Sequence, residues 1–490
     1  MKINYNMKML TKRFSSFVSV MTENVTTKLL LVLPITLLTC TLNTQAQQLW
    51  ALTPEGGASN GGTIIRMNSD GSGLNVEFSY QCSMSSGCMP MGNLMQASNG
   101  QLYGTCFLGG QYASCTIDRY DPFTGTYYDI YDFDIVNGDY PRSGLIEAGN
   151  GKLYGVASTG GSGNSGVLYS IDLLTNAYTV EFTFSGSNGM FPWGCPVLKN
   201  GILYGLATGG GIFTDGVMYS FNIANNTYNV VHHFDEATGM TPKGSLFEAS
   251  NGILYGLTSE GGSDGYGTLF SYNTATSSFT QLHSFYGTDG SEPEGTLMQA
   301  ANGNLYGVTT SGGINNAGVL FCYYIATNAC VKLYDFNAAT GSNPTGNLYQ
   351  SPDQKLYGSA SNGGANNQGA LFSYDLTAGT YTNIHNFNGT DGSHPAGGFV
   401  LVDITTGIAP LTQNSFSVYP NPVQEELNIS FGATKRYSVK LTNASGQLLF
   451  SSENYSSQSA ISTVRLPKGI YFIEVKEDNG KNTTQKVVKM

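Results

Sequence analysis

Ala301-Asn-Gly-Asn-Leu-Tyr-Gly-Val-Thr-Thr-Ser-Gly-Gly313 contains a tripeptide, Leu-Tyr-Gly, that returns along the chain at a nearly constant interval. Complete copies begin at residues 102, 153, 203, 254, 305 and 356, so successive copies lie 50 or 51 residues apart. Leu49-Trp50-Ala51 is a degenerate seventh copy. A proline keeps the same period, at residues 90, 141, 192, 242, 293, 344 and 395. Self-similarity of this kind indicates seven tandem units over residues 47–403.

Each unit reads as four short β-strands. In the unit that begins at Pro242, the apolar segments are residues 244–249, 254–258, 267–272 and 278–285, and turn residues separate them. One such sheet cannot bury both of its faces, whereas sheets packed radially cover one another. The sequence therefore predicts an all-β protein, with a seven-bladed β-propeller of ~51-residue, four-stranded repeats.

The two ends of the repeat region predict how the ring closes. The chain enters the repeat at a second strand, Leu49-Trp50-Ala51, and leaves it after a first strand, residues 398–402. Pairing of these two segments would complete one blade and cover two open sheet edges. A solenoid would instead need a capping unit at each end, and the sequence shows none, so a closed ring is favoured.

With these motifs, residues 47–403 resemble the GloVer tandem-repeat proteins, in which a repeat region is joined to varying anchors. The resemblance is specific because seven copies keep register. The first copy departs from the pattern at Trp50 and Ala51, and residues 79–89 are extended. The resemblance implies a β-rich surface module and no defined activity.

After a linker at residues 404–413 the glycine-rich period stops, and residues 414–490 read as a small Ig-like β-sandwich. This segment resembles the type IX secretion (type A) sorting domain. The residues that carry the resemblance are Tyr419, Pro420, Asn421, Pro422, Lys468, Gly469 and Tyr471. It implies recognition by the type IX secretion machinery of a Bacteroidetes-type cell, removal of the tail, and release or attachment to surface lipopolysaccharide. An ordinary Ig-like binding module is the alternative.

Residues 1–46 are typical of a secretory signal peptide. Lys28 precedes an apolar run that ends at Cys40, and Thr44-Gln45-Ala46 places small residues where a signal peptidase cleaves. The run is too short to span a bilayer, and no other segment is predicted to do so. A later start codon and lipidation at Cys40 are alternatives. We expect an extracellular or outer-membrane-surface location.

Charge is uneven along the chain. Of 22 Lys and Arg and 33 Asp and Glu residues, residues 47–413 hold eight basic and 26 acidic ones, a net charge of −18. A body of this charge repels phosphate backbones and anionic membrane surfaces, which argues against nucleic acid as a partner. Neutral glycans, cations and basic protein surfaces remain open.

Export permits disulfides, and seven cysteines follow residue 46. Three pairs are close in sequence, and Cys195 is left over. The candidate disulfides are Cys82 with Cys88, Cys106 with Cys115, and Cys322 with Cys330. No pair has the CxxC spacing of a metal site, so local staples are favoured over metal binding.

The sequence contains no Ser/His/Asp arrangement, phosphate-binding loop or HExxH motif. His232, His283 and His385 each lie two residues before a Phe, in a slot that other units fill with Tyr or Phe. Such a slot predicts packing rather than general-base catalysis. His233 and His394 have no evident partner in the sequence.

The acidic residues leave carboxylate chemistry open, because the spacing of a glycosidase pair is set in three dimensions. Asp289-Gly290 and Asp391-Gly392 occur in matching loops, and four Asp cluster within residues 129–139, but none makes a full calcium-ligand series. We expect solvated turns, no metal site and no cofactor, with calcium as the alternative.

A binding face follows from the topology. Strands alternate in direction, so the Gly-Gly loops and the loops that end at each proline share one face. The residue after the proline differs in every unit: Met91, Arg142, Trp193, Lys243, Glu294, Thr345 and Ala396. This variety predicts exposure. The candidate ligand-binding residues are Trp193, Phe191, Tyr140 and Arg142, because exposed aromatics beside carboxylates suit sugar rings. Trp193 as a plug between blades is the alternative.

These observations predict an exported binding or structural module, with a glycan or a surface protein as its ligand. The alternative is a polysaccharide-active hydrolase or lyase. Such an enzyme would gather one non-repeating set of polar residues in the central channel. The fold alone does not separate the two, since propellers host both.

Overall fold

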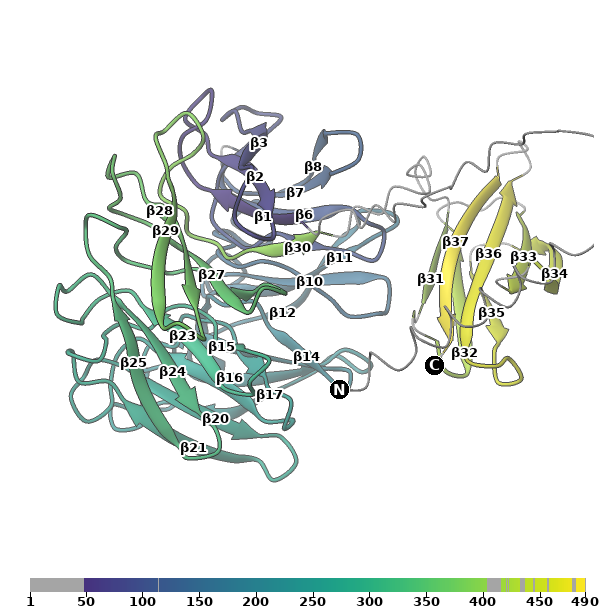
Figure 1. The fold of residues 1–490 in the computed structure, drawn as a ribbon. Helices are drawn as coiled ribbons and strands as arrows, with labels where there is room; N and C mark the ends of the chain where they lie inside the picture. Colours follow the sequence, from purple (N-terminus) through teal and green to yellow (C-terminus); the bar gives the residue numbers. More distant parts are fainter. Residues whose placement is uncertain are drawn as a thin grey trace, which may run out of the picture. The chain divides into compact units, whose positions relative to one another are not determined.

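The computed structural model describes residues 48–402, except residue 113, and most of residues 416–489. The gaps in the second stretch are residues 420, 422, 432–436, 444–445, 456–457 and 478–481. The predicted signal peptide and linker, and Pro420 and Pro422 of the sorting motif, lie outside the described residues. Strands dominate both stretches, and the described residues contain one short 3-10 helix, Gly186–Asn188, and no α-helix. The predicted all-β class is confirmed (Figure 1).

Residues 48–402 form seven antiparallel sheets. The first joins β1 (Gln48–Thr53), β2 (Thr63–Asn68), β3 (Asn75–Ser79) and β30 (Val400–Val402). The second joins β4 (Gly87–Pro90), β5 (Met95–Gln96), β6 (Leu102–Gly109), β7 (Thr116–Asp121) and β8 (Thr126–Asp132). The third joins β9 (Ile146–Glu147), β10 (Lys152–Ala157), β11 (Val167–Asp172) and β12 (Tyr178–Thr183).

The other four sheets follow in chain order. The fourth joins β13 (Met190–Pro192), β14 (Val197–Lys199), β15 (Ile202–Gly209), β16 (Val217–Asn222) and β17 (Thr227–His233). The fifth joins β18 (Phe247–Glu248), β19 (Leu254–Thr258), β20 (Thr268–Asn273) and β21 (Ser278–Ser284). The sixth joins β22 (Met298–Gln299), β23 (Leu305–Thr309), β24 (Val319–Tyr324) and β25 (Ala329–Asp335). The seventh joins β26 (Tyr349–Gln350), β27 (Lys355–Ala360), β28 (Ala370–Asp375) and β29 (Thr380–Asn386).

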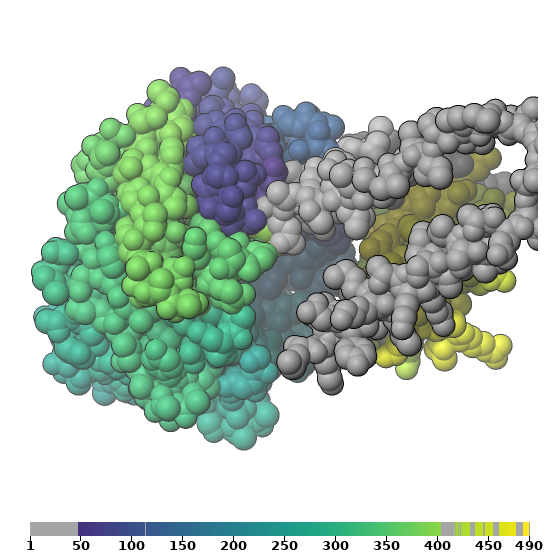
Figure 2. Space-filling model, in the orientation of Figure 1, coloured from purple at the N-terminus to yellow at the C-terminus, as the bar shows by residue number. Residues whose placement is uncertain are grey.

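The first sheet contains both ends of the repeat region. β30 pairs antiparallel with β1, with Leu49 opposite Leu401 and Trp50 opposite Val400. The predicted pairing of the last strand with the first is thereby confirmed. Figure 2 shows the same closure at the surface, where the purple first strands lie beside the bright green end of the repeats. The edge of β1 is therefore covered by the chain's own last repeat strand.

The core lies between neighbouring sheets. Tyr103 of the second sheet and Tyr169 of the third share one buried cluster, and clusters of the same kind follow between later sheets. The seventh sheet meets the first in the same way, because Tyr357 and Leu371 pack with Leu49. Each sheet therefore buries its faces against the sheets before and after it, as the repeat argument requires.

The tail, described by itself, consists of two antiparallel sheets. One joins β31 (Phe416–Tyr419), β32 (Glu426–Phe431) and β35 (Gln458–Ser462). The other joins β33 (Tyr437–Asn443), β34 (Leu448–Tyr455), β36 (Gly469–Glu477) and β37 (Asn482–Lys489). Alternating residues of both sheets, such as Leu427, Ile429, Val439 and Ile473, form one buried core. Among the described residues, no helix has the length and apolar character that a membrane span requires.

The cysteines form one of the three expected disulfides. Cys82 and Cys88 are bonded, but Cys106, Cys115, Cys322 and Cys330 carry free thiols. Strand register explains the correction. Cys322 pairs with Val331 and not with Cys330, and Cys106 pairs with Thr116. A register offset of one residue turns the two thiols of each expected pair to opposite faces of the sheet.

Candidate ligand-binding site

The site begins with a backbone conformation that all seven repeats share. The residue before each repeat proline has a φ between 52° and 57°, although none is glycine: Met89, Tyr140, Phe191, Thr241, Glu292, Asn343 and His394. This left-handed conformation is costly for a residue with a Cβ, so the surroundings must enforce it. Backbone hydrogen bonds do so, for example from Phe191 to Ser165 at 2.8 Å and from Thr241 to Asp215 at 2.9 Å.

The second residue after the proline is held against the same residue of the next repeat. A Cβ on Gly194 would lie 2.3 Å from the carbonyl oxygen of Gly244, and one on Gly244 would lie 2.2 Å from that of Gly295. The last repeat contacts the first in the same way, because a Cβ on Gly397 would lie 2.9 Å from the carbonyl oxygen of Gly92. Close backbone approach therefore favours glycine at this position, which Ser143 fills in the second repeat and glycine fills in the other six.

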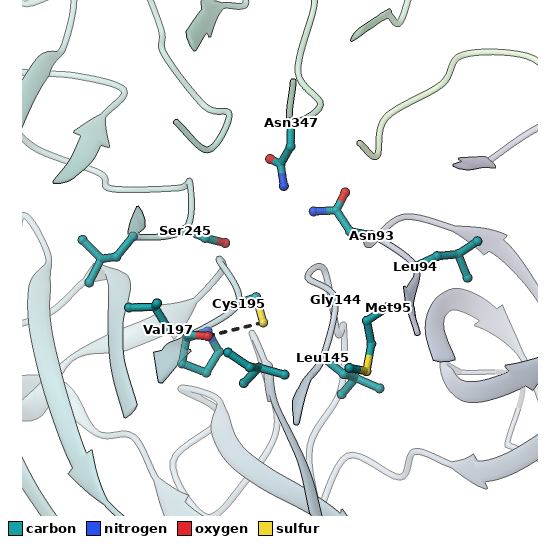
Figure 3. Close-up of a pocket in the computed structure, with 12 residues that line it drawn as sticks. Asn93, Leu94, Met95, Gly144, Leu145, Cys195, Val197, Ser245 and Asn347 are labelled. Atoms are coloured by element: carbon teal, nitrogen blue, oxygen red, sulfur yellow. Dashed lines mark hydrogen bonds between the residues drawn. The ribbon is translucent and has the colours of Figure 1, made fainter. Parts of the chain in front are cut away.

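These loops surround a cavity of about 450 Å³. Every repeat contributes the residue that follows its proline: Met91, Arg142, Trp193, Lys243, Glu294, Thr345 and Ala396. A smaller cavity of about 230 Å³ shares four lining residues with the first, namely Asn93, Gly144, Ser245 and Asn347. Figure 3 shows Asn93, Cys195, Ser245 and Asn347 gathered around it. The seven repeats thus converge on one continuous hollow.

Rings and charges alternate in a row of five residues, four of which line the larger cavity. The Arg142 guanidinium carbon lies 4.2 Å from the ring centroid of Trp193 and 5.3 Å from that of Phe107. The Lys243 ammonium lies 5.7 Å from the Trp193 centroid and 2.5 Å from Glu294. We call these five residues the aromatic–cation strip. Burial lowers the pKa of Arg142 from its usual value.

The predicted site residues divide between this strip and its rim. Arg142 and Trp193 line the cavity, and Trp193 is partly buried against Arg142. Tyr140 packs on Phe107, with ring centroids 4.9 Å apart, and is 37% exposed. Phe191 is 36% exposed and is not among the lining residues. Sequence reasoning missed Phe107, which lies at the end of β6 and follows no repeat proline.

Comparison with known proteins identifies the family of the repeat region. Residues 38–218 and 195–409 match the profile of the Gloeobacter/Verrucomicrobia repeat. The chain belongs to the Gloeobacter/Verrucomicrobia repeat family. Residues 417–490 match a secretion system C-terminal sorting domain, so both resemblances drawn from the sequence are confirmed. The sorting domain implies interaction with the type IX secretion machinery and export to the cell surface or beyond.

Solved structures place this repeat protein among propeller-like folds. Two of them are proteins of Bacteroides uniformis and Bacteroides fragilis, each assigned as a 6-phosphogluconolactonase. They are 14% and 16% identical to this chain, cover 72% and 74% of it over 99% of their own lengths, and both have a TM-score of 0.51. Likeness at this identity concerns the fold alone. No protein with a curated description matches the chain.

The histidines of this repeat protein have partners that its sequence did not reveal. His232 stacks on Phe279 of the next sheet with ring centroids 3.7 Å apart, which confirms its packing role, and burial lowers its pKa to about 4. His233 accepts a backbone N–H of the neighbouring loop at 3.2 Å. His394 lines the cavity and donates through Nδ1 to the Ser361 carbonyl at 3.0 Å. The interpretation that His233 and His394 lack partners was wrong.

The two matching Asp-Gly loops hold histidines. Nε2 of His283 lies 2.7 Å from Asp289, and Nε2 of His385 lies 2.9 Å from Asp391. Each Asp also accepts a backbone N–H from three residues earlier. These two histidines therefore hold the Asp-Gly loops through their carboxylates, in addition to the packing role that the sequence predicted. In the described part of the chain, no three His, Cys, Asp or Glu side chains are grouped so that they could hold a metal ion.

Proposed function

We propose that this chain is an extracellular carbohydrate-binding protein, a seven-bladed β-propeller that type IX secretion delivers to the surface of a Bacteroidetes-type cell or beyond it. The seven sheets, the pairing of β1 with β30 and the propeller-like relatives support the architecture. In this proposal residues 1–46 are a signal peptide, residues 47–403 the propeller, residues 404–413 a linker, and residues 414–490 an Ig-like sorting domain.

One observation carries the binding role. Seven copies of one loop, fixed by the same backbone conformation, place seven different side chains around one cavity. A rigid framework with variable side chains at a single place is the arrangement that specific recognition needs. The cavity of about 450 Å³ lies within the range of small-ligand sites, roughly 300–1,000 Å³.

The lining suits a sugar. Trp193 supplies aromatic surface, and Asn93, Ser245, Thr296 and Asn347 supply amides and hydroxyls in the same cavity. Arg142 covers part of the indole ring, so the sugar meets the aromatic surface beside a guanidinium group rather than on a bare platform.

A polysaccharide-active hydrolase is the second candidate, because the carboxylates of Glu55 and Glu294 line the same cavity. Each has a basic side chain as its neighbour. Glu294 pairs with Lys243 at 2.5 Å, and Glu55 lies 3.8 Å from Nε2 of His394. The ion pair of Glu294 counts against its use as a nucleophile or base, so binding is the better-supported role.

The test is a glycan array probed with the exported chain, residues 47–490, with released products followed in the same mixtures. For a bound glycan, Trp193→Ala should weaken binding about ten-fold, or about 1.4 kcal/mol, because it removes aromatic contact. Phe213→Ala is the matched control, since Phe213 is 52% exposed and lies outside the cavity lining. Product release would overturn the binding role in favour of the hydrolase, and a silent array would overturn the carbohydrate assignment.

A further inference from the structure

Resting on the proposed function, we infer that the carbohydrate carries a carboxylate and that Arg142 binds it. The ligand class is then an acidic sugar, a uronic acid residue, rather than a neutral one. Arg142 is then the residue that determines specificity for this sugar.

Cations in the repeat region are almost all paired. Residues 48–402 contain eight Lys and Arg residues. Six of them form ion pairs with carboxylates: Arg66, Lys152, Lys199, Lys243, Lys332 and Lys355. Among the residues that the structure describes, the two cations without a carboxylate partner are Arg119, which lies over Tyr128, and Arg142. Of these two, Arg142 lines the cavity.

Arg142 is held by aromatic rings rather than by acceptors. Trp193 and Phe107 pack on its guanidinium group, at 4.2 and 5.3 Å from carbon to ring centroid. Among the described residues, no carboxylate, carbonyl or hydroxyl accepts a hydrogen bond from it. Packed rings orient a guanidinium and leave the N–H groups at its edge available. That edge matches the two oxygens of a carboxylate, which accepts a bidentate pair of hydrogen bonds.

The surroundings favour one carboxylate over many. Glu294 is neutralised by Lys243, so it does not compete for Arg142 across the strip. The net charge of −18 over residues 47–413 repels a densely charged polyanion. A single carboxylate on an otherwise neutral sugar satisfies both conditions. Its attraction to a half-buried guanidinium exceeds that of an exposed ion pair, because water screens it less.

The test uses matched methyl glycosides that differ in one group. Calorimetry measures the binding of the glucuronide, galacturonide and mannuronide to the exported chain, each against its neutral parent sugar. We expect at least one uronide to bind about ten-fold more tightly than its parent. Arg142→Gln should remove this preference, so that each uronide and its parent sugar bind equally, while Arg142→Lys should retain part of it because lysine keeps the charge but cannot form the bidentate pair.

Arg119→Gln is the control, because it removes the other cation without a carboxylate partner and does not alter the cavity lining. Retained preference in Arg142→Gln, or equal binding of every pair, would overturn the inference and leave the carbohydrate role intact. Binding of glucose 6-sulfate as tight as that of the preferred uronide would overturn the assignment of the ligand's charged group as a carboxylate. If the wild-type chain binds no glycan, the proposed function itself would be contradicted.

Discussion

Asp118 occupies a buried position of β7 that aromatic side chains fill in five other repeats: Tyr169, Tyr219, Phe270, Phe321 and Phe372. A buried carboxyl group needs hydrogen-bond donors. Cys106 donates to it at 2.8 Å, Thr116 at 2.7 Å and Tyr127 at 2.8 Å. Burial outweighs these bonds and raises the pKa of Asp118 to about 6. The folded chain therefore holds this proton more tightly than the unfolded chain does.

Stability should fall as pH rises from about 4 to 6. In this window the unfolded carboxyl has lost its proton and the folded one has not, so raising the pH favours unfolding. A change in pKa from 3.8 to about 6 corresponds to about 3 kcal/mol of lost stability above pH 6. Urea unfolding at a series of pH values measures it.

Asp118→Asn should flatten this part of the pH dependence. Its amide oxygen can still accept from Thr116 and Tyr127, so the variant should fold. Asp264→Asn, in an exposed turn, is the control. Parallel pH profiles for wild type and Asp118→Asn would contradict the role of this carboxyl group.

At the scale of elements, the loops around the repeat prolines have a tightly constrained backbone conformation. The left-handed residue before the proline recurs in all seven loops, and the close-packed glycine after it recurs in every loop except the second, which has Ser143. Packing of this density tolerates no added methyl group without displacement of a neighbouring backbone. The same elements hold the residue after each proline, which differs in all seven repeats.

Gly244→Ala should destabilise the repeat region by about 2 kcal/mol, because its Cβ would lie 2.2 Å from a carbonyl oxygen that belongs to the backbone. Urea unfolding measures the loss. Gly163→Ala is the matched control, since the nearest atoms to its Cβ lie at 3.7 and 3.8 Å and its φ is not positive. Equal stability of the two variants would contradict the proposed ring of close contacts.

At the scale of the whole molecule, two family assignments meet in one chain: a repeat region that offers a cavity and a tail that matches a sorting domain. In the proposed function, the tail accounts for delivery and the repeat region for recognition. This division predicts that the two functions can be lost separately.

A variant that ends at residue 413 should remain inside a host that has type IX secretion, because the sorting domain at residues 417–490 is missing. Cell fractionation and immunoblotting measure its location. The purified variant should keep the ligand binding of the full chain. A reporter protein fused to residues 414–490 is the complementary test and should be exported. Export of the shortened variant would contradict the assignment of the tail.

The candidate site was partly visible in the sequence. Arg142 and Trp193 were found because they follow a periodic proline and differ from their counterparts. Phe107 was not found, because it packs on Arg142 from β6, and no local pattern marks such a residue. The pairing of His283 with Asp289 was likewise hidden, since the periodic slot predicted packing and the loop partner is set by the fold.

The sequence by itself determined the number of repeats, the strands within each repeat, the pairing of the two ends and the secretion tail. Periodicity and turn chemistry are local properties of the chain, and repetition makes them recognisable. Only the tertiary structure decided which thiols meet, which cations lack a partner and which seven loops share a cavity. Those facts depend on register and on the faces that neighbouring sheets present to each other. A shift of one residue left Cys322 and Cys330 on opposite faces, and no spacing along the chain could show it.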